Sequence, residues 1–327
     1  MIVTEFTRRF GVDAPIMQGG MQWIGNGELA AAVSNAGGLG TITALTFPTP
    51  DALREQIDIC RDLTDKPFAV NLTTLPSINP PPYEGYRDVM ISSGVPIVET
   101  SGSNPAVFMP GYRDAGVKVV HKATSLKHAL KAEDAGVDAI ALVGFEAAGH
   151  PGELDVPILV LLRAAARRIS TPLLAAGGFA DGPGLAAAMA LGAEGVLMAT
   201  RFMATVETPI DDKVKAALVA GDELNTNLIF RQLNNTARVV KNAISDQVVE
   251  ILAGGGDFES VRELVAGRRG RTVYETGDLD AGIWWAGISQ ALIEDVPTCR
   301  ELIERIVAEA EDVISGRLVG ALGETVR

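Results

Sequence analysis

Residues 171–202 are TPLLAAGGFADGPGLAAAMALGAEGVLMATRF, a segment with two apolar runs. The apolar run Pro172 to Ala176 ends at Gly177-Gly178, and a second apolar run, Gly195 to Ala199, ends at Thr200. An Ala-rich helical segment joins the two runs. This order is typical of a right-handed β-α-β unit, whose parallel strands deliver glycine and threonine to one edge of a sheet.

The ends of these two runs suit a phosphate. The glycines free backbone N–H groups, Thr200 adds a hydroxyl, and a short helix begins directly after it. A Gly-Gly pair after a strand is also typical of a tight turn, so the pairing of two strand ends is what favours phosphate binding. In a (β/α)8 barrel these runs would be strands 7 and 8, where such barrels often bind phosphate.

Six further apolar runs precede this unit at a nearly constant interval. From Met17 to Leu197, the central residues of the eight runs are 25, 28, 28, 22, 22, 32 and 23 positions apart. Eight strands that alternate with helices predict an α/β fold of the (β/α)8 TIM barrel type. A doubly wound sheet is the alternative, but its Gly-rich turn should follow the first strand, whereas Gly37-Gly38-Leu39-Gly40 precedes a strand. The predicted strands are 14–17, 39–43, 68–72, 97–100, 118–123, 139–144, 172–176 and 195–199.

Beyond residue 206 the strand pattern stops. We therefore expect a barrel over residues 1–206 and a smaller helical domain over 207–327, whose last helix, about 299–318, could return to pack on the barrel. A basic cluster in this part is expected to be a solvated loop, with contact to an anionic ligand as the alternative; it comprises Arg268, Arg269 and Arg271. The helical patterns are 211–220, 224–244, 246–253, 260–267 and 299–318.

Composition narrows the class of protein. The 327 residues are 47% hydrophobic, and 28 basic against 41 acidic residues give a net charge of −13. A scattered acidic excess argues against nucleic acid or an anionic membrane as partner. No secretory signal and no apolar run of about 20 residues is present, so a cytoplasmic protein is expected. Cys60 and Cys299 stand far apart without a CxxC pattern, so neither a disulfide framework nor a metal site is predicted.

Polar residues and glycines gather where the predicted strands end, and the loops of a barrel converge there. Amide, ammonium and hydroxyl groups beside accessible backbone suit a planar heterocycle with a phosphate tail. These residues are Gln18, Gly19, Gly20, Thr43, Asn71, Thr100, Lys122, His150, Gly177, Gly178, Ala199 and Thr200.

Eight segments together resemble the nitronate monooxygenase family, formerly called 2-nitropropane dioxygenases, which are FMN-dependent TIM-barrel enzymes. The resemblance covers essentially the whole chain, and within the family it is greatest to the NAD(P)H:quinone reductase subgroup, in AGHPGE and in the Pro-rich segment 75–82. The segments are PIMQGGMQW (15–23), NAGGLGTI (35–42), PFAVNLTTLP (67–76), VKVVHK (117–122), GFEAAGHPGE (144–153), LLAAGGFADG (173–182), MATRF (198–202) and NTARVVKN (235–242).

The resemblance implies FMN as cofactor and assigns residues to it. Lys122 would lie near the N1/O2 side of the ring, where an ammonium stabilises the charge of the reduced flavin; a salt-bridged barrel lysine is the alternative. Val143 stands where some relatives have an acidic residue, so no role transfers there. The ring would contact Met17, Gln18, Gly19, Gly20, Asn71, Ala148 and Gly149, and the phosphate would contact Gly177, Gly178, Ala199 and Thr200.

His150 is the candidate catalytic residue beside Lys122. In the nitronate-oxidising branch a histidine after strand 6 is the proposed base that takes the α-proton of a nitroalkane, which suits a neutral imidazole. The quinone reductase branch also has a histidine there, so His150 does not separate the branches, and a structural role is the alternative. His121, which points away from Lys122, and His128 are expected to be structural.

The resemblance implies a ping-pong reaction in which NAD(P)H transfers hydride to the flavin and a quinone then takes two electrons. Pro76 and Pro80 belong to a stiff segment that would cover the site as a lid. Met21 and Trp284 are further candidates for contact with substrate, although packing in the core of the second domain is the favoured interpretation of the pair Trp284-Trp285.

Three alternatives stay open. A nitronate monooxygenase would use O2 and the same flavin, and a non-enzymatic flavin or phospho-ligand binding protein is the alternative of a different class. The inosinate dehydrogenase group shares the barrel but needs a cysteine after strand 6, and Phe145 to Gly152 has none. Whether the chain forms a homodimer is also open.

Overall fold

The computed structural model describes residues 2–74 and 80–322. Eight parallel strands form one sheet in the order β1-β8-β7-β6-β5-β4-β3-β2. A bridge between Met17 and Leu39, with the Gln18 N–H donating to the Leu39 carbonyl at 2.9 Å, joins β1 to the start of β2 and closes the sheet. The predicted TIM barrel is therefore confirmed. The strands are β1 (Ile16–Gln18), β2 (Gly40–Thr43), β3 (Phe68–Thr74), β4 (Ile97–Gly102), β5 (Lys118–Ala123), β6 (Ala139–Val143), β7 (Leu173–Ala176) and β8 (Gly195–Met198).

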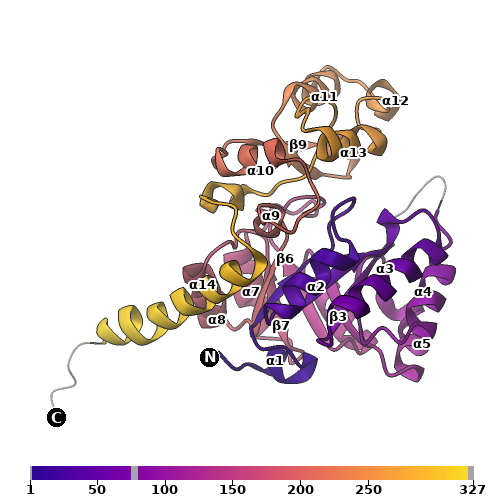
Figure 1. Cartoon of the computed structure of the whole chain (residues 1–327). Coiled ribbons are helices and arrows are strands. Elements are labelled where there is room, and N and C mark those ends of the chain that lie inside the picture. Colours follow the sequence, from indigo (N-terminus) through magenta and orange to yellow (C-terminus); the bar gives the residue numbers. More distant parts are fainter. Residues whose placement is uncertain (1, 75–79, 323–327) are drawn as a thin grey trace, which may run out of the picture.

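Helices surround the strands (Figure 1). Within the described part of the chain, no helix has both the length and the apolar character needed to cross a bilayer. The helices of the barrel are α1 (Glu5–Phe10), α2 (Gly27–Asn35), α3 (Pro50–Leu63), α4 (Tyr83–Ser92), α5 (Met109–Asp114), α6 (Leu126–Ala135), α7 (Ile158–Ala166), α8 (Gly182–Leu191) and α9 (Thr200–Met203). Short 3-10 turns are η1 (Ala44–Thr46) and η2 (Pro105–Val107).

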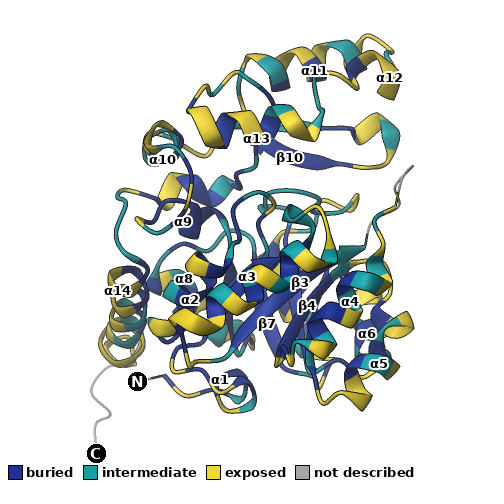
Figure 2. Ribbon diagram, turned by 45° about the vertical axis from the view of Figure 1, so that its right-hand side comes forward, coloured by how far each residue is buried: buried dark blue, intermediate teal, exposed yellow. Residues whose placement is uncertain are grey.

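The barrel interior is a packed core that is closed at one end by α1. Phe6 and Phe10 of α1 are buried and form one cluster with interior residues such as Met17 and Leu174. Figure 2 shows the strands as an almost continuously buried layer. Because the amino-terminal end is filled in this way, the carboxyl ends of the strands are the open end of the barrel.

Residues 207–298 form a cap over that open end (Figure 1), with a pair of strands that the sequence did not predict. Residues 224–244, predicted as helical, contain the antiparallel strands β9 (Thr226–Ile229) and β10 (Ala237–Val240). The helix prediction was wrong because Phe230 and Asn234 adopt left-handed backbone, with φ of 65° and 51°, which ends any helix there. The other elements are α10 (Asp212–Val219), η3 (Arg231–Leu233), α11 (Ala243–Ala253), α12 (Phe258–Val261), α13 (Gly267–Thr276) and η4 (Ile288–Leu292).

The basic cluster lies in helix α13, so the expectation of a loop was wrong. Gly270, Val273 and Tyr274 are buried at helical spacing, and the packing of this face outweighs the low helix propensity of glycine. All three arginine side chains have partners within the protein: Arg268 pairs with Glu263, Arg271 pairs with Glu275, and Arg269 donates to the Ala281 carbonyl.

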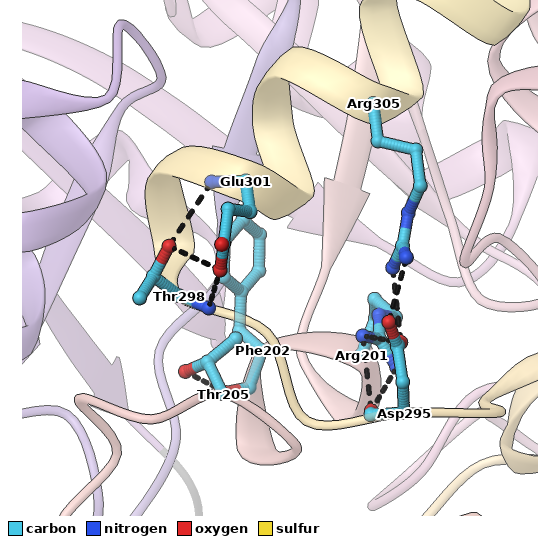
Figure 3. A network of polar contacts seen from close by, with 7 residues as sticks. All are labelled: Arg201, Phe202, Thr205, Asp295, Thr298, Glu301 and Arg305. Atoms are coloured by element: carbon cyan, nitrogen blue, oxygen red, sulfur yellow. Dashed lines mark hydrogen bonds and ion pairs between the residues drawn. The ribbon is translucent and has the colours of Figure 1, made fainter.

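Helix α14 (Cys299–Asp312), continued by η5 (Val313–Leu318), returns from the cap to the barrel and packs against α8 and α2. Its approach to α8 is close, since a Cβ on Gly182 would lie 2.3 Å from the Cβ of Glu309. An ionic network fixes the start of the helix (Figure 3): the Asp295 carboxylate accepts from buried Arg201 at 2.9 Å and from Arg305 at 2.6 Å. The Thr298 and Glu301 capping box begins α14 in the same view.

Candidate active site

A cavity of about 410 Å³ opens at the carboxyl ends of the strands, within the size range of small-molecule sites. The barrel contributes loop and strand-end residues to its wall, and the cap contributes Tyr274, Trp285, Gly287 and Ser289. The predicted site residues that line it are Gly20, Met21, Asn71, Lys122, Ala148, Gly149, His150, Gly177, Ala199 and Thr200.

One end of the cavity has the geometry of an anion cradle. Gly177 and Gly178 have φ of 83° and 86°, the left-handed region that glycine tolerates. A Cβ on Gly177 would lie 2.8 Å from the Cβ of Ala147, so the backbone itself forms the wall here. The Thr200 hydroxyl accepts from the Gly287 N–H at 3.0 Å, which ties the cap to this end. Gly178 follows directly but faces Glu146.

At the other end, a fully buried carboxylate that the sequence analysis missed holds three groups together. Glu99 accepts from the Gly20 N–H at 3.1 Å and from the Asn71 side-chain amide at 2.5 Å, and its Oε1 lies 3.2 Å from Lys122 Nζ. We expected Thr100 at this strand end, but Thr100 bonds His121 on the outer side of the barrel. The alternation of side chains along β4 was the signal that could have identified Glu99.

Met17, Gln18 and Gly19 lie beneath the cavity and do not line it. Met17 is buried in the barrel interior. The Gln18 side chain accepts from the Thr41 N–H at 2.8 Å and donates to the Gly19 carbonyl, and the Gly19 N–H donates to Met198 at 2.9 Å. These bonds fix the turn that brings Gly20 into the wall.

The loop after β6 is held by the cap. Gly149 and Arg238 exchange backbone hydrogen bonds of 3.1 and 2.7 Å, and the Arg238 guanidinium donates to the Phe145 carbonyl at 2.9 Å. His150 follows in this loop, with its ring 6.0 Å from that of Trp285. Burial lowers the pKa of His150, while the carboxylate of Glu153 opposes that shift. A neutral imidazole is therefore the dominant form near neutral pH.

The candidates for substrate contact lie in different places. Trp284 is 1% exposed and packs in the core, whereas its neighbour Trp285 lines the cavity. The prediction that Trp284 contacts substrate is therefore wrong, and Trp285 takes its place as the candidate. Pro76 lies outside the described residues, and Pro80 is exposed and absent from the wall, to which Pro81 contributes.

A second chamber of about 570 Å³ adjoins the first. It extends towards β5 and α6, where His121, His128 and Lys131 line it. His121, expected to be structural, is bonded to Thr100 at 2.9 Å, and burial lowers its pKa to about 4. The residues common to both chambers are Gly20, Thr73, Lys122, Val143, Ala148, Gly149 and His150.

Comparison with known proteins identifies the family. A family model described as nitronate monooxygenase matches residues 4–309. A nitronate monooxygenase of Paraburkholderia phytofirmans is 30% identical, over 93% of this chain and 94% of that protein. A (3aS,4S,5R,7aS)-5-hydroxy-7a-methyl-1-oxo-octahydro-1H-indene-4-carboxyl-CoA dehydrogenase of Rhodococcus jostii is 31% identical, over 94% and 95%. The structure of FabK from Thermotoga maritima superposes with a TM-score of 0.92 at 34% identity, covering 98% of this chain and all of that one. The chain therefore belongs to the nitronate monooxygenase family of oxidoreductase enzymes.

Proposed function

We propose that the protein is an FMN-dependent reductase in which NAD(P)H and a quinone use one site in turn. Members of this family are generally FMN-dependent. The observation that supports FMN here is the pairing of a glycine cradle with an apolar cavity: Gly177 could not carry a side chain without contacting Ala147, and Thr200 lines the same cavity. A phosphate would be held at Gly177, Ala199 and Thr200, and a ring would lie towards Gly20 and Lys122.

The bound flavin would supply hydride acceptance and donation, and the chain supplies orientation, charge and exclusion of water. Lys122 presents an ammonium at the wall and is held in place by Glu99 at 3.2 Å. Asn71 is fixed by the same carboxylate, so both groups are oriented before a ligand arrives. Trp285 and Tyr274 of the cap exclude water from one side of the cavity.

The test is the anaerobic mixing of purified protein with NADH and, separately, with NADPH, while the absorbance of the flavin band is followed. Bleaching by either nucleotide, followed by recovery on addition of a quinone, is the expected result. A yellow protein that neither nucleotide bleaches would contradict the proposal.

Nitronate oxidation is the second candidate, and the position of His150 favours it. Its imidazole lines both chambers, and burial lowers its pKa and so favours the neutral form, which could take the α-proton of a nitroalkane and produce the nitronate. Oxygen uptake with propionate 3-nitronate in the absence of nicotinamide is the measurement that supports this candidate over the reductase.

The acceptor of the reductase could also be a coenzyme A thioester. The relative from Rhodococcus jostii is named as a dehydrogenase of a carboxyl-CoA compound and matches this chain along almost its full length. Reoxidation of the bleached flavin by an α,β-unsaturated acyl-CoA, faster than by a quinone, would favour this acceptor.

A further inference from the structure

The second chamber differs in chemistry from the cavity proposed for FMN. The two join at Lys122 and His150, and the chamber then leads away from the barrel axis to exposed residues. The polar side chains along it come from β4, β5, α6 and the cap, and include Asn104, His128, Lys131, Asn235 and Thr236. An elongated ligand whose reactive end lies at His150 would therefore extend along a polar groove.

A lysine and a histidine without an ion pair to any residue that the structure describes lie at the outer end of this groove. Lys131 and His128 stand three residues apart on α6, hence on one face of that helix. Both are exposed, and neither side chain has an ion pair with another described residue. Glu153, the carboxylate among the described residues that line the chamber, is bound by the N–H of Thr236 at 2.7 Å and by its hydroxyl. These bonds hold the Glu153 carboxylate at Thr236, whereas the ammonium of Lys131 has no ion pair with any described residue.

We propose that this chamber binds the diphosphate-bearing adenosine tail of the co-substrate, with Lys131 and His128 at the phosphates. The inference rests on the proposed function, which supplies the reactive end at the flavin. Nicotinamide dinucleotides and coenzyme A thioesters both carry an ADP unit. In a ping-pong cycle the two enter the same site in turn, so one groove serves both tails.

The first experiment compares complete and truncated co-substrates in Lys131→Glu. Reduced nicotinamide mononucleotide lacks the ADP half of NADH, and an N-acetylcysteamine thioester lacks that of an acyl-CoA. Reversal of the charge should lower kcat/KM for the complete compound about tenfold and change that for the truncated one by less than about twofold. Lys127→Glu is the matched control, since Lys127 is exposed on the same helix but does not line the chamber, and it should leave both values unchanged.

A second measurement requires no turnover, and so separates this inference from the proposed function. Binding of ADP-ribose and of coenzyme A to the FMN-loaded protein is followed by calorimetry. Binding that Lys131→Glu weakens and Lys127→Glu preserves supports the groove even if no nicotinamide reduces the flavin. If Lys131→Glu weakens the binding of ADP-ribose, the groove takes the tail of a nicotinamide dinucleotide. If it weakens the binding of coenzyme A, the groove takes the tail of a thioester. Absence of binding by both fragments, equal weakening by both variants, or equal loss with complete and truncated substrates would overturn the inference.

Discussion

Nζ of Lys122 lies 3.2 Å from Oε1 of Glu99, a carboxylate that is wholly buried under the cavity wall. Sequence offered two interpretations of Lys122, a functional ammonium and a salt-bridged barrel lysine, and the structure shows that it is in an ion pair while it also lines the cavity. Its charge is thus partly balanced before a ligand binds. A buried pair of this kind is held for position more than for stability.

Replacing Glu99 by Gln removes the negative charge beside Lys122, while the glutamine side chain keeps nearly the shape of the glutamate. The midpoint potential of the bound flavin should rise by about 30 mV, equivalent to about 1.4 kcal/mol, because the unopposed ammonium favours the reduced form. Lys122→Met should lower it. The midpoint potentials are measured by equilibration with a reference dye. Glu84→Gln, at an exposed position on α4, is the control. Equal potentials in the wild type and all three variants would refute this role for the ion pair.

Gly177→Ala should abolish retention of the flavin. The left-handed backbone costs alanine about 1–2 kcal/mol, and the new methyl would press on Ala147. The ratio of flavin to protein after gel filtration, together with the melting temperature, measures the loss. Gly316→Ala, where nothing lies within 4 Å of an added Cβ, should retain flavin as the wild type does.

His150→Asn separates the two candidate functions. If His150 takes the α-proton, oxidation of a neutral nitroalkane should fall by about 100-fold or more, because the nitronate must form first. Oxidation of a preformed nitronate, which has no α-proton to lose, and reduction of flavin by NAD(P)H should both change far less. Since burial holds the imidazole pKa below its usual value of about 6.5, wild-type oxidation of a nitroalkane should fall to half its maximum only at a pH below 6.5. Similar losses in all three reactions would indicate a structural histidine.

Glu153→Gln tests the electrostatics of the same residue. Glu153 raises the pKa of His150 against the effect of burial, so its neutralisation should lower that pKa further. An NMR titration of the histidine ring protons measures the change. A His150 pKa that rises in the variant would contradict the assignment of a raising effect to the Glu153 charge.

Asp295→Ala should lower the free energy of unfolding by about 1–3 kcal/mol, because Arg201, which is 2% exposed, loses its counter-ion. The Arg305 guanidinium bonded to Asp295 holds the pKa of that carboxyl below its usual range. The contribution is therefore fully present above the unfolded pKa of about 3.9, and it is lost progressively as pH falls from there through the lower pKa of the folded carboxyl. Denaturant melts at pH 7 and pH 3 check both statements, and Glu304→Ala, in an exposed pair with Arg300, should change stability by less than about 1 kcal/mol.

The barrel could be predicted from the sequence because buried parallel strands are continuous apolar runs, and β5 has the bounds expected for it. Strand ends could be predicted for the same reason, and Asn71, Lys122 and Gly177 do meet at one cavity. Glu99 was missed because a carboxylate inside an apolar strand gives no periodic signal of its own. It shows only when side-chain alternation is followed residue by residue.

In the cap, local sequence patterns predicted the structure less well, because tertiary packing determines the secondary structure and the side-chain directions there. Two glycines in GRRGR suggested a loop, yet a buried face at Gly270, Val273 and Tyr274 keeps the segment helical. The adjacent residues Trp284 and Trp285 differ in the direction in which their side chains point. The backbone N–H of Trp285 donates to the Tyr274 hydroxyl at 3.1 Å, and this bond helps to fix which tryptophan faces the cavity. No short-range rule contains that information.

The return of α14 to α8 makes the cap an insertion that is anchored at both ends. The buried residues Leu302, Ile303 and Ile306 belong to the barrel's core although they follow the cap in the chain. A chimera that takes its cap from another family member therefore needs two crossover points, one near residue 206 and one just before Cys299. A single crossover would exchange part of the scaffold along with the specificity it was meant to transplant.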